Sequence, residues 1–223
     1  MENKAYEKVI LHIKGRILEG SLRQGEKLPP ERELAEQLGV GRNSVREALR
    51  TLEIIGVISS TQGAGNFVSA SFEKSLVELM TMMFLLQKTD YRQISELRQG
   101  IETQAALLAL ERIDAPTVTR LSEIAGALGA GGSEERNVVL DKQLHYTIAQ
   151  TSGNQLIVEI LQALSDVMDL FISDLRREIL TSDLSRDQLQ HSHEGMVRGL
   201  LLRDRQILLQ AIGEHFRLIT EHL

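Results

Sequence analysis

Apolar residues recur at helical spacing along most of the chain. Over 5–18 they fall on one side of a helix, and Gly20 follows where a helix-ending glycine is expected. Residues 30–39 and 42–55 repeat the pattern, and a tight turn at 39–41 separates them. The first 55 residues are therefore predicted to form three helices, the second of them short.

A hairpin is expected to follow these helices. Residues 56–61 and 66–69 have strand character and flank a glycine-containing turn at 62–65. Three helices followed by a two-stranded ribbon are typical of a winged helix-turn-helix domain. We place this domain at 1–70.

The rest of the chain is predicted to be helical almost throughout. We expect a linker at 71–75 and then an all-helical antiparallel bundle over 76–223. Its helices are expected at 75–88, 91–111, 115–129, 134–151, 154–180, 186–203 and 205–222. The predicted fold is therefore mainly α, with a small winged domain followed by a bundle of about seven helices.

The third helix combines an apolar face with a cationic edge. Arg42, Arg46 and Arg50 are four residues apart, so they span about 80° of the helix surface, about 110° from the apolar centre. Such spacing usually marks a solvated face. It also suits a helix that packs on its domain and contacts guanine edges and phosphates. The pattern alone leaves both interpretations open.

Composition narrows the class of protein. The 223 residues include no cysteine, which excludes disulfides, thiolate metal sites and cysteine catalysis. Residues 1–70 contain 10 Lys and Arg against 9 Asp and Glu, so any contact with nucleic acid must depend on a local patch. There is no signal segment and no apolar stretch long enough to span a bilayer, so we expect a cytoplasmic protein with no membrane partner.

The first domain resembles a known family. The string LPPERELAEQLGVGRNSVREALRTLEIIGVI, followed by GAGNFV, is similar to the DNA-binding domain of the GntR family of bacterial transcription regulators. The resemblance covers 5–69 and implies that the helix after the turn is the recognition helix, with the wing near the minor groove. The residues expected to bind operator DNA are Arg32, Arg42, Asn43, Ser44, Arg46, Gln62 and Gly63.

Two positions depart from the family pattern. Pro30 stands where the family commonly has serine, and Gly41 stands where it has serine or threonine. Glycine in place of a hydroxyl cap costs only a few tenths of a kcal/mol, so both helices are expected to form. Asn43 or Ser44 is expected to take over any phosphate contact of the missing hydroxyls.

Three histidines of the second domain fall on apolar helix faces. They are His145, one turn after Asp141, together with His193 and His215, whereas His191 falls on the polar side of its helix. A lone inward histidine is usually a hydrogen-bonded core residue. Three inward histidines together with an inward aspartate are harder to explain as core residues, because each unpartnered buried polar group costs about 1–3 kcal/mol. A divalent metal ion is the simplest common partner for these side chains.

The types and spacing of these four residues resemble those of a known effector domain. The FCD domain of the FadR subgroup of GntR regulators carries an Asp-x3-His pair and two later histidines 22 residues apart, as found here. The resemblance covers 75–222 and implies that Asp141, His145, His193 and His215 ligate a metal. Zinc is our first choice, with nickel, iron(II) and manganese as alternatives. A metal-free histidine cluster is the other interpretation.

Arg98 is the expected effector-binding residue. It matches the arginine of the family's E-L-R-x3-E segment, which here runs from Glu96 to Glu102. It is expected either to bind the carboxylate of the effector or to pair with Glu102 one turn on. The sequence does not distinguish between these roles.

Together these features predict a metabolite-responsive transcription regulator and not an enzyme. As a homodimer it would bind a palindromic double-stranded operator. It is expected to act as a repressor whose DNA binding weakens when a small organic acid binds at the metal. The alternatives are a purely structural metal and a metal-free pocket for an acyl or other organic ligand. A metal-dependent hydrolase has less support, because no general base is evident near the ligands.

Overall fold

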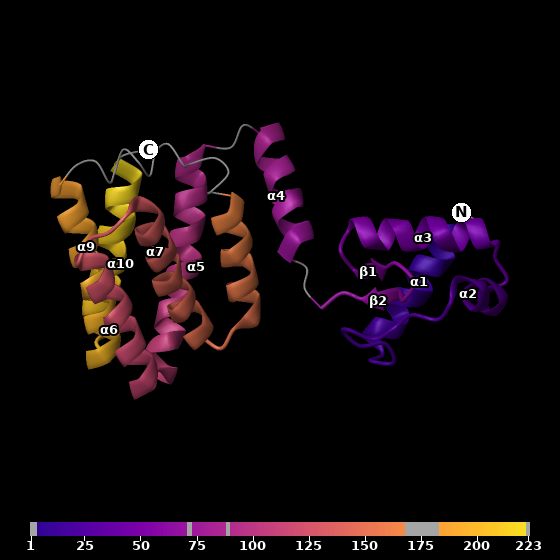
Figure 1. Cartoon of the computed structure of the whole chain (residues 1–223), viewed down its shortest axis with the longest axis horizontal. Coiled ribbons are helices and arrows are strands. Elements are labelled where there is room, and N and C mark those ends of the chain that lie inside the picture. The colour runs from indigo at the N-terminus through magenta and orange to yellow at the C-terminus, as the bar shows by residue number, and fades with distance from the viewer. Residues whose placement is uncertain (1–3, 71–72, 88–89, 168–182, 222–223) are drawn as a thin grey trace. The chain divides into compact units, whose positions relative to one another are not determined.

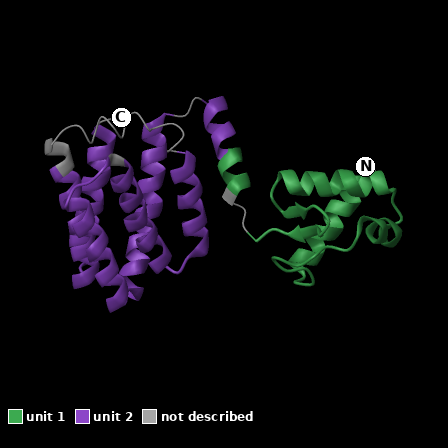
Figure 2. Ribbon diagram, viewed as in Figure 1, with its two compact units in different colours: residues 1–79 green, residues 80–223 purple. Residues whose placement is uncertain are grey.

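The structure is a computed structural model that describes residues 4–70, 73–87, 90–167 and 183–221. The chain divides into two compact units, residues 1–79 and residues 80–223 (Figure 2). The predicted mainly α fold is confirmed, with a winged helix-turn-helix in the first unit and helices in the second. No helix in the described part of the chain is long and apolar enough to cross a membrane.

The first unit packs three helices and a hairpin around one core. In chain order its elements are α1 (Ala5–Leu18), α2 (Glu31–Leu38), α3 (Arg42–Ile54), β1 (Ile58–Thr61) and β2 (Gly65–Val68) (Figure 1). The strands are antiparallel, with Ile58 opposite Val68. Val9, Leu34 and Val45 are fully buried, so the apolar stripes of the three helices meet in this core.

The helix ends follow the sequence pattern. Gly20 has the left-handed φ of 72° expected after α1. Pro30 and Gly41 precede α2 and α3, and neither provides a side-chain cap, as the departures from the family pattern predict. In the second unit, by contrast, the side chains of Asp114 and Ser133 cap their helices.

The second unit is a helical bundle. Its described helices are α4 (Glu73–Gln87), α5 (Tyr91–Arg112), α6 (Ala115–Gly129), α7 (Glu134–Thr151), a helix over 155–167, α9 (Asp183–Leu202) and α10 (Arg205–Glu221). The helix expected at 154–180 lies outside the described residues from 168 onward. α4 begins within the segment expected as a linker at 71–75 and contains the division between the two units.

Close approach of α9 and α10 shapes the core of the bundle. A Cβ on Gly199 would lie 2.7 Å from the backbone nitrogen of Leu208, and one on Gly195 would lie 2.8 Å from Ala211 Cβ. Both distances are far below an ordinary carbon contact, so each position requires glycine at this helix spacing. α5 packs on α7 and α10, and α6 packs on α7 and α9, which completes the bundle.

Gly199→Ala is expected to destabilise the bundle. The added methyl group would overlap the α10 backbone, and overpacking of this kind costs about 1–3 kcal/mol. Gly213→Ala is the matched control, because a Cβ at Gly213 meets nothing within 4 Å and alanine has the higher helix propensity. Thermal unfolding in the presence of a chelator measures both, and equal melting temperatures would contradict the close contact.

Candidate functional site

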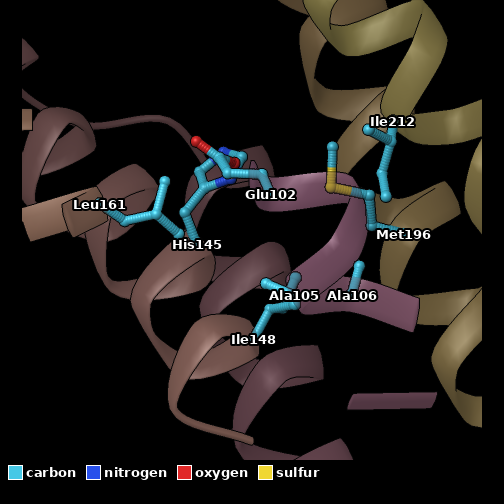
Figure 3. A pocket seen from close by; sticks show the side chains of 8 residues that line it. All are labelled: Glu102, Ala105, Ala106, His145, Ile148, Leu161, Met196 and Ile212. Carbon is cyan, nitrogen blue, oxygen red and sulfur yellow. The ribbon is translucent and has the colours of Figure 1, made fainter. Parts of the chain in front are cut away.

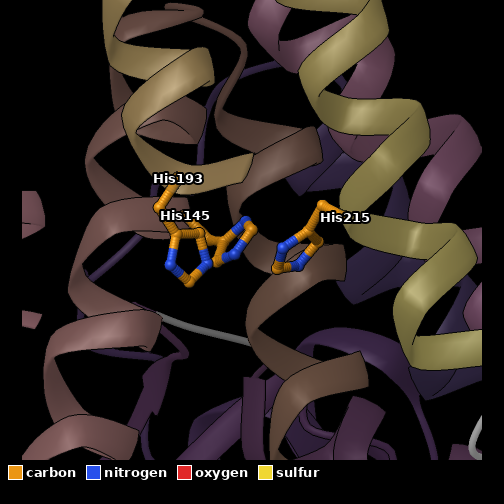
Figure 4. Close-up of side chains that lie close together, drawn as sticks. All are labelled: His145, His193 and His215. Atoms are coloured by element: carbon orange, nitrogen blue, oxygen red, sulfur yellow. The ribbon is translucent and has the colours of Figure 1, made fainter. Parts of the chain in front are cut away.

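Three buried imidazoles converge inside the second unit. His145 comes from α7, His193 from α9 and His215 from α10, and their exposed fractions are only 8%, 2% and 2%. Figure 4 shows the three rings turned toward one another. One ring nitrogen from each lies within 4.8 Å of the others. The burial predicted from the helical patterns is thus confirmed, and His191 is exposed as expected.

Asp141 lies at the edge of this histidine cluster. Its Oδ1 is 3.1 Å from His193 Nε2 and 3.8 Å from His145 Nε2. Both Nε2 atoms are buried, and neither makes a hydrogen bond. Ligand atoms bound to one ion at about 2.1 Å lie about 3 to 4 Å apart. The three imidazoles therefore form a group that could hold a metal ion, and Asp141 lies beside two of them.

The sequence analysis missed the role of Glu102, a buried carboxylate on α5. Its Oε1 accepts from Nε and Nη2 of Arg98 at 2.9 and 2.6 Å, and its Oε2 lies 2.5 Å from His145 Nδ1. Of the two roles considered for Arg98, the structure shows the ion pair. The signal for Glu102 was a charged residue on the apolar face that carries Ile94 and Ala105.

One sequence-based argument needs correction. A carboxylate does lie beside the proposed ligands, so the absence of a nearby base was wrong as a reason against hydrolysis. Both oxygens of Glu102 are, however, already engaged, one with Arg98 and the other with His145. A carboxylate held in this way is a structural partner of its neighbours.

Burial and charge set the pKa values of the cluster. Burial alone would raise the pKa of Glu102, but Arg98 and His145 lower that pKa more, to well below its ordinary value. Burial alone would lower the pKa of His145, but the charge and hydrogen bond of Glu102 raise it overall. Burial, with His145 and His193 nearby, lowers the pKa of His215 well below the ordinary value. Glu102 is thus the main charged partner of His145.

A second residue missed in the sequence is Ser192 on α9. It is 1% exposed, and its Oγ lies 3.2 Å from His215 Nδ1 on α10. The same hydroxyl lies 2.6 Å from the carbonyl oxygen of Leu189. A serine on a helix has no sequence signal that identifies a partner on another helix, so only the packed structure reveals this contact.

A small cavity adjoins the site on its apolar side. Glu102 and His145 line it together with the apolar residues Ala105, Ala106, Ile148, Leu161, Met196 and Ile212 (Figure 3). Its volume of about 10 Å³ is near the lower limit for one water molecule. This cavity is far too small for an acyl chain.

The residues expected to bind DNA are accessible in the first unit. Ser44 is half-buried, and the other six are exposed, namely Arg32, Arg42, Asn43, Arg46, Gln62 and Gly63. Arg46 lies 3.4 Å from Glu31, and Arg32 lies 3.4 Å from Glu36. Exposed pairs of this length are worth little, so both guanidinium groups are available to a phosphate or a base.

Comparison with known proteins identifies both units. Residues 5–68 match the family described as bacterial regulatory proteins, gntR family, and residues 93–218 match the FCD domain. The chain belongs to the GntR family. This GntR protein is a bacterial transcription regulator with an FCD effector domain, and not an enzyme. GntR regulators bind operator DNA and effector ligands.

Similar curated proteins are regulators too. The chain is 27% identical to the Glc operon transcriptional activator of Escherichia coli (strain K12), across 97% of this chain and 88% of that protein. It is 29% identical to the putative L-lactate dehydrogenase operon regulatory protein of the same strain, across 96% and 84%. It is 30% identical to the HTH-type transcriptional regulator LutR of Bacillus subtilis (strain 168), across 80% and 82%.

A solved structure agrees with the fold. The Streptococcus agalactiae GntR superposes with a TM-score of 0.67 at 22% identity, covering 98% of this chain and 100% of that one. At this identity the likeness supports the fold alone.

Proposed function

We propose that this GntR protein is a metabolite-responsive repressor of the FadR subgroup that binds a palindromic operator as a homodimer. In this proposal a small carboxylate effector binds at a divalent metal in the helical unit and releases the DNA. The supporting observation is the convergence of three buried imidazoles, two of which lie beside Asp141 and have an Nε2 atom without a hydrogen bond.

Asp141, His145, His193 and His215 would hold the metal ion. Their oxygen and imidazole ligands suit zinc, our first choice, and also nickel, iron(II) or manganese. When bound, the ion would supply a Lewis acid with open positions for the oxygen atoms of an effector. Arg98, which lies beside the site on α5 and is paired with Glu102, would provide a second contact for the carboxylate.

The name of one relative supports a small hydroxy acid as the effector class, because that protein is described as a putative L-lactate dehydrogenase operon regulatory protein. The cavity beside His145 has space for about one water molecule, so an acyl chain would need the bundle to open much further than a small acid would. A purely structural metal is the alternative to an effector-binding metal.

The apolar surface of α4 supports a dimer. Its exposed large apolar residues are Leu79, Met82, Met83, Leu85 and Leu86. Contiguous exposed apolar residues usually mark an interaction surface. A second copy of the chain is the occupant that a two-fold operator requires, because its two half-sites must each receive one α3 helix.

His193→Ala and His215→Ala are expected to lose the metal. Each variant removes one of three imidazole ligands, so zinc that copurifies with the wild-type protein should be absent or bound far more weakly. Elemental analysis after purification without chelators measures this. His191→Ala, on the same helix as His193 but exposed, is the control and should retain the metal. Wild-type protein without metal, and unable to bind added zinc, would end the metal proposal.

Arg46→Ala is expected to weaken operator binding by about 1–3 kcal/mol, because a guanidinium on the exposed face of α3 contacts a base or a phosphate. The probe is a duplex selected with the wild-type protein, and binding is measured by fluorescence anisotropy over a range of salt concentrations. Affinity of the wild type should fall steeply with salt. Arg198→Ala removes an exposed arginine from α9 instead and should bind as the wild type does. An equal loss of affinity in both variants would show that α3 is not the recognition helix.

Small carboxylates are expected to stabilise the zinc-loaded protein but not the chelator-treated protein. A ligand at 100 times its dissociation constant adds about 2.7 kcal/mol to the free energy of unfolding, which a thermal-shift screen detects. The best carboxylate should also release the selected duplex. Arg98→Lys keeps the charge beside Glu102 but loses the planar fork, so its shift should shrink. Arg92→Ala on the exposed side of α5 should respond normally. Equal shifts with and without zinc would favour a purely structural metal.

A further inference from the structure

Two of the three buried imidazoles are held at Nδ1 by a side chain outside the proposed ligand set. Glu102 on α5 lies 2.5 Å from His145 Nδ1, and Ser192 on α9 lies 3.2 Å from His215 Nδ1. These contacts come from different helices and different chemical groups. In both rings they engage the nitrogen that a metal ion bound at Nε2 would leave free.

The contact of Ser192 determines the position of the hydrogen on His215. The serine hydroxyl has one hydrogen, and the carbonyl oxygen of Leu189, 2.6 Å away, can only accept it. The serine oxygen must therefore accept a hydrogen bond from His215, so Nδ1 of His215 carries the hydrogen. A neutral imidazole has only one N–H group, and Nε2 of His215 thus presents its lone pair.

The contact of Glu102 has the same effect on His145. An ionised carboxylate only accepts hydrogen bonds, so His145 Nδ1 carries a hydrogen that points at Oε2. A separation of 2.5 Å is too short for an ion between the two atoms, since ligands bound at about 2.1 Å lie about 3 Å apart. Glu102 is therefore an outer partner of the site. The other oxygen of Glu102 is fixed by Arg98, so the carboxylate cannot rotate freely (Figure 3 labels Glu102 and His145).

We infer that Glu102 and Ser192 are positioning residues that hold the hydrogen of His145 and of His215 at Nδ1 and so leave Nε2 of each ring to bind the proposed metal. The inference rests on the proposed metal site. Such outer hydrogen bonds orient ligating histidines and typically change metal affinity by about 10–100-fold when removed. Ser192 precedes His193 in the sequence, so one turn of α9 supplies a ligand and orients a second ligand on α10.

Helix packing makes the contact of Ser192 possible. The glycines at 195 and 199 let α9 approach α10 closely, one and two turns after Ser192. A short side chain such as serine reaches the neighbouring helix only at this spacing. An alanine at 192 would leave His215 Nδ1 buried without a partner and free to exchange its hydrogen with Nε2.

The test combines zinc affinity with direct observation of the tautomers. Protein labelled with ¹⁵N-histidine has six histidines, and His215→Gln identifies the signals of His215 in long-range ¹H–¹⁵N spectra. Chelator-treated wild type should show His215 protonated at Nδ1, and zinc-loaded protein should show both His145 and His215 protonated at Nδ1. Ser192→Ala should give mixed tautomers at His215 and bind zinc about 10–100-fold more weakly. Glu102→Gln should weaken zinc binding similarly, because an amide can also donate to Nδ1.

Ser95→Ala is the matched control, since Ser95 is equally buried in the bundle but its hydroxyl lies near Thr220. It should keep the wild-type zinc affinity, as measured by competition with a chelating dye. Wild-type His215 protonated at Nε2, or unchanged zinc affinity in Ser192→Ala, would overturn the inference. The wild-type spectrum requires no variant, so it determines the tautomer of His215 even where a variant misfolds. Wild-type protein that binds no zinc would contradict the proposed function. The spectrum of the metal-free protein would still determine the tautomer of His215 in that case.

Discussion

The burial of three imidazoles in an apolar bundle is the constraint on which the second unit depends. Each ring nitrogen that loses water without gaining a partner costs about 1–3 kcal/mol. Glu102 and Ser192 satisfy one nitrogen on each of two rings, and Arg98 balances the charge of Glu102. The Nε2 atoms of His145 and His193 make no hydrogen bond and lie 3.8 and 3.1 Å from Asp141 Oδ1. The helices α5, α7, α9 and α10 each contribute to this arrangement, so their packing and the chemistry of the site cannot be separated.

The first unit is subject to a different constraint, because its binding surface must remain exposed. Val45 and Leu52 bury one face of α3, and the arginines lie on the surface beside it. Helix formation at this position does not depend on a side-chain cap, since Gly41 provides none. The ion pair between Arg46 and Glu31 is long and exposed, so a nucleic acid can replace it at little cost. The buried face of α3 and its proposed recognition face are therefore different.

Periodicity predicted most of the fold and the burial of the histidines, because both follow from where apolar residues fall on a helix. It could not predict which polar groups would meet. Glu102 was visible as a charge on an apolar face, but its contact with His145 depends on how α5 packs against α7. Ser192 gave no signal at all, since a serine in a helix is ordinary and its partner lies 23 residues away on another helix. Contacts that depend on rotamers and helix spacing appear only in the folded chain.

The tight contact at Gly195 and Gly199 also limits how the bundle can deform. Backbones this close interlock, so α9 and α10 cannot slide along one another without collision. This contact holds His193 and His215 at a fixed spacing. Among the described helices, a displacement of α7, which carries His145 and Asp141, would widen the histidine cluster without opening the contact between α9 and α10.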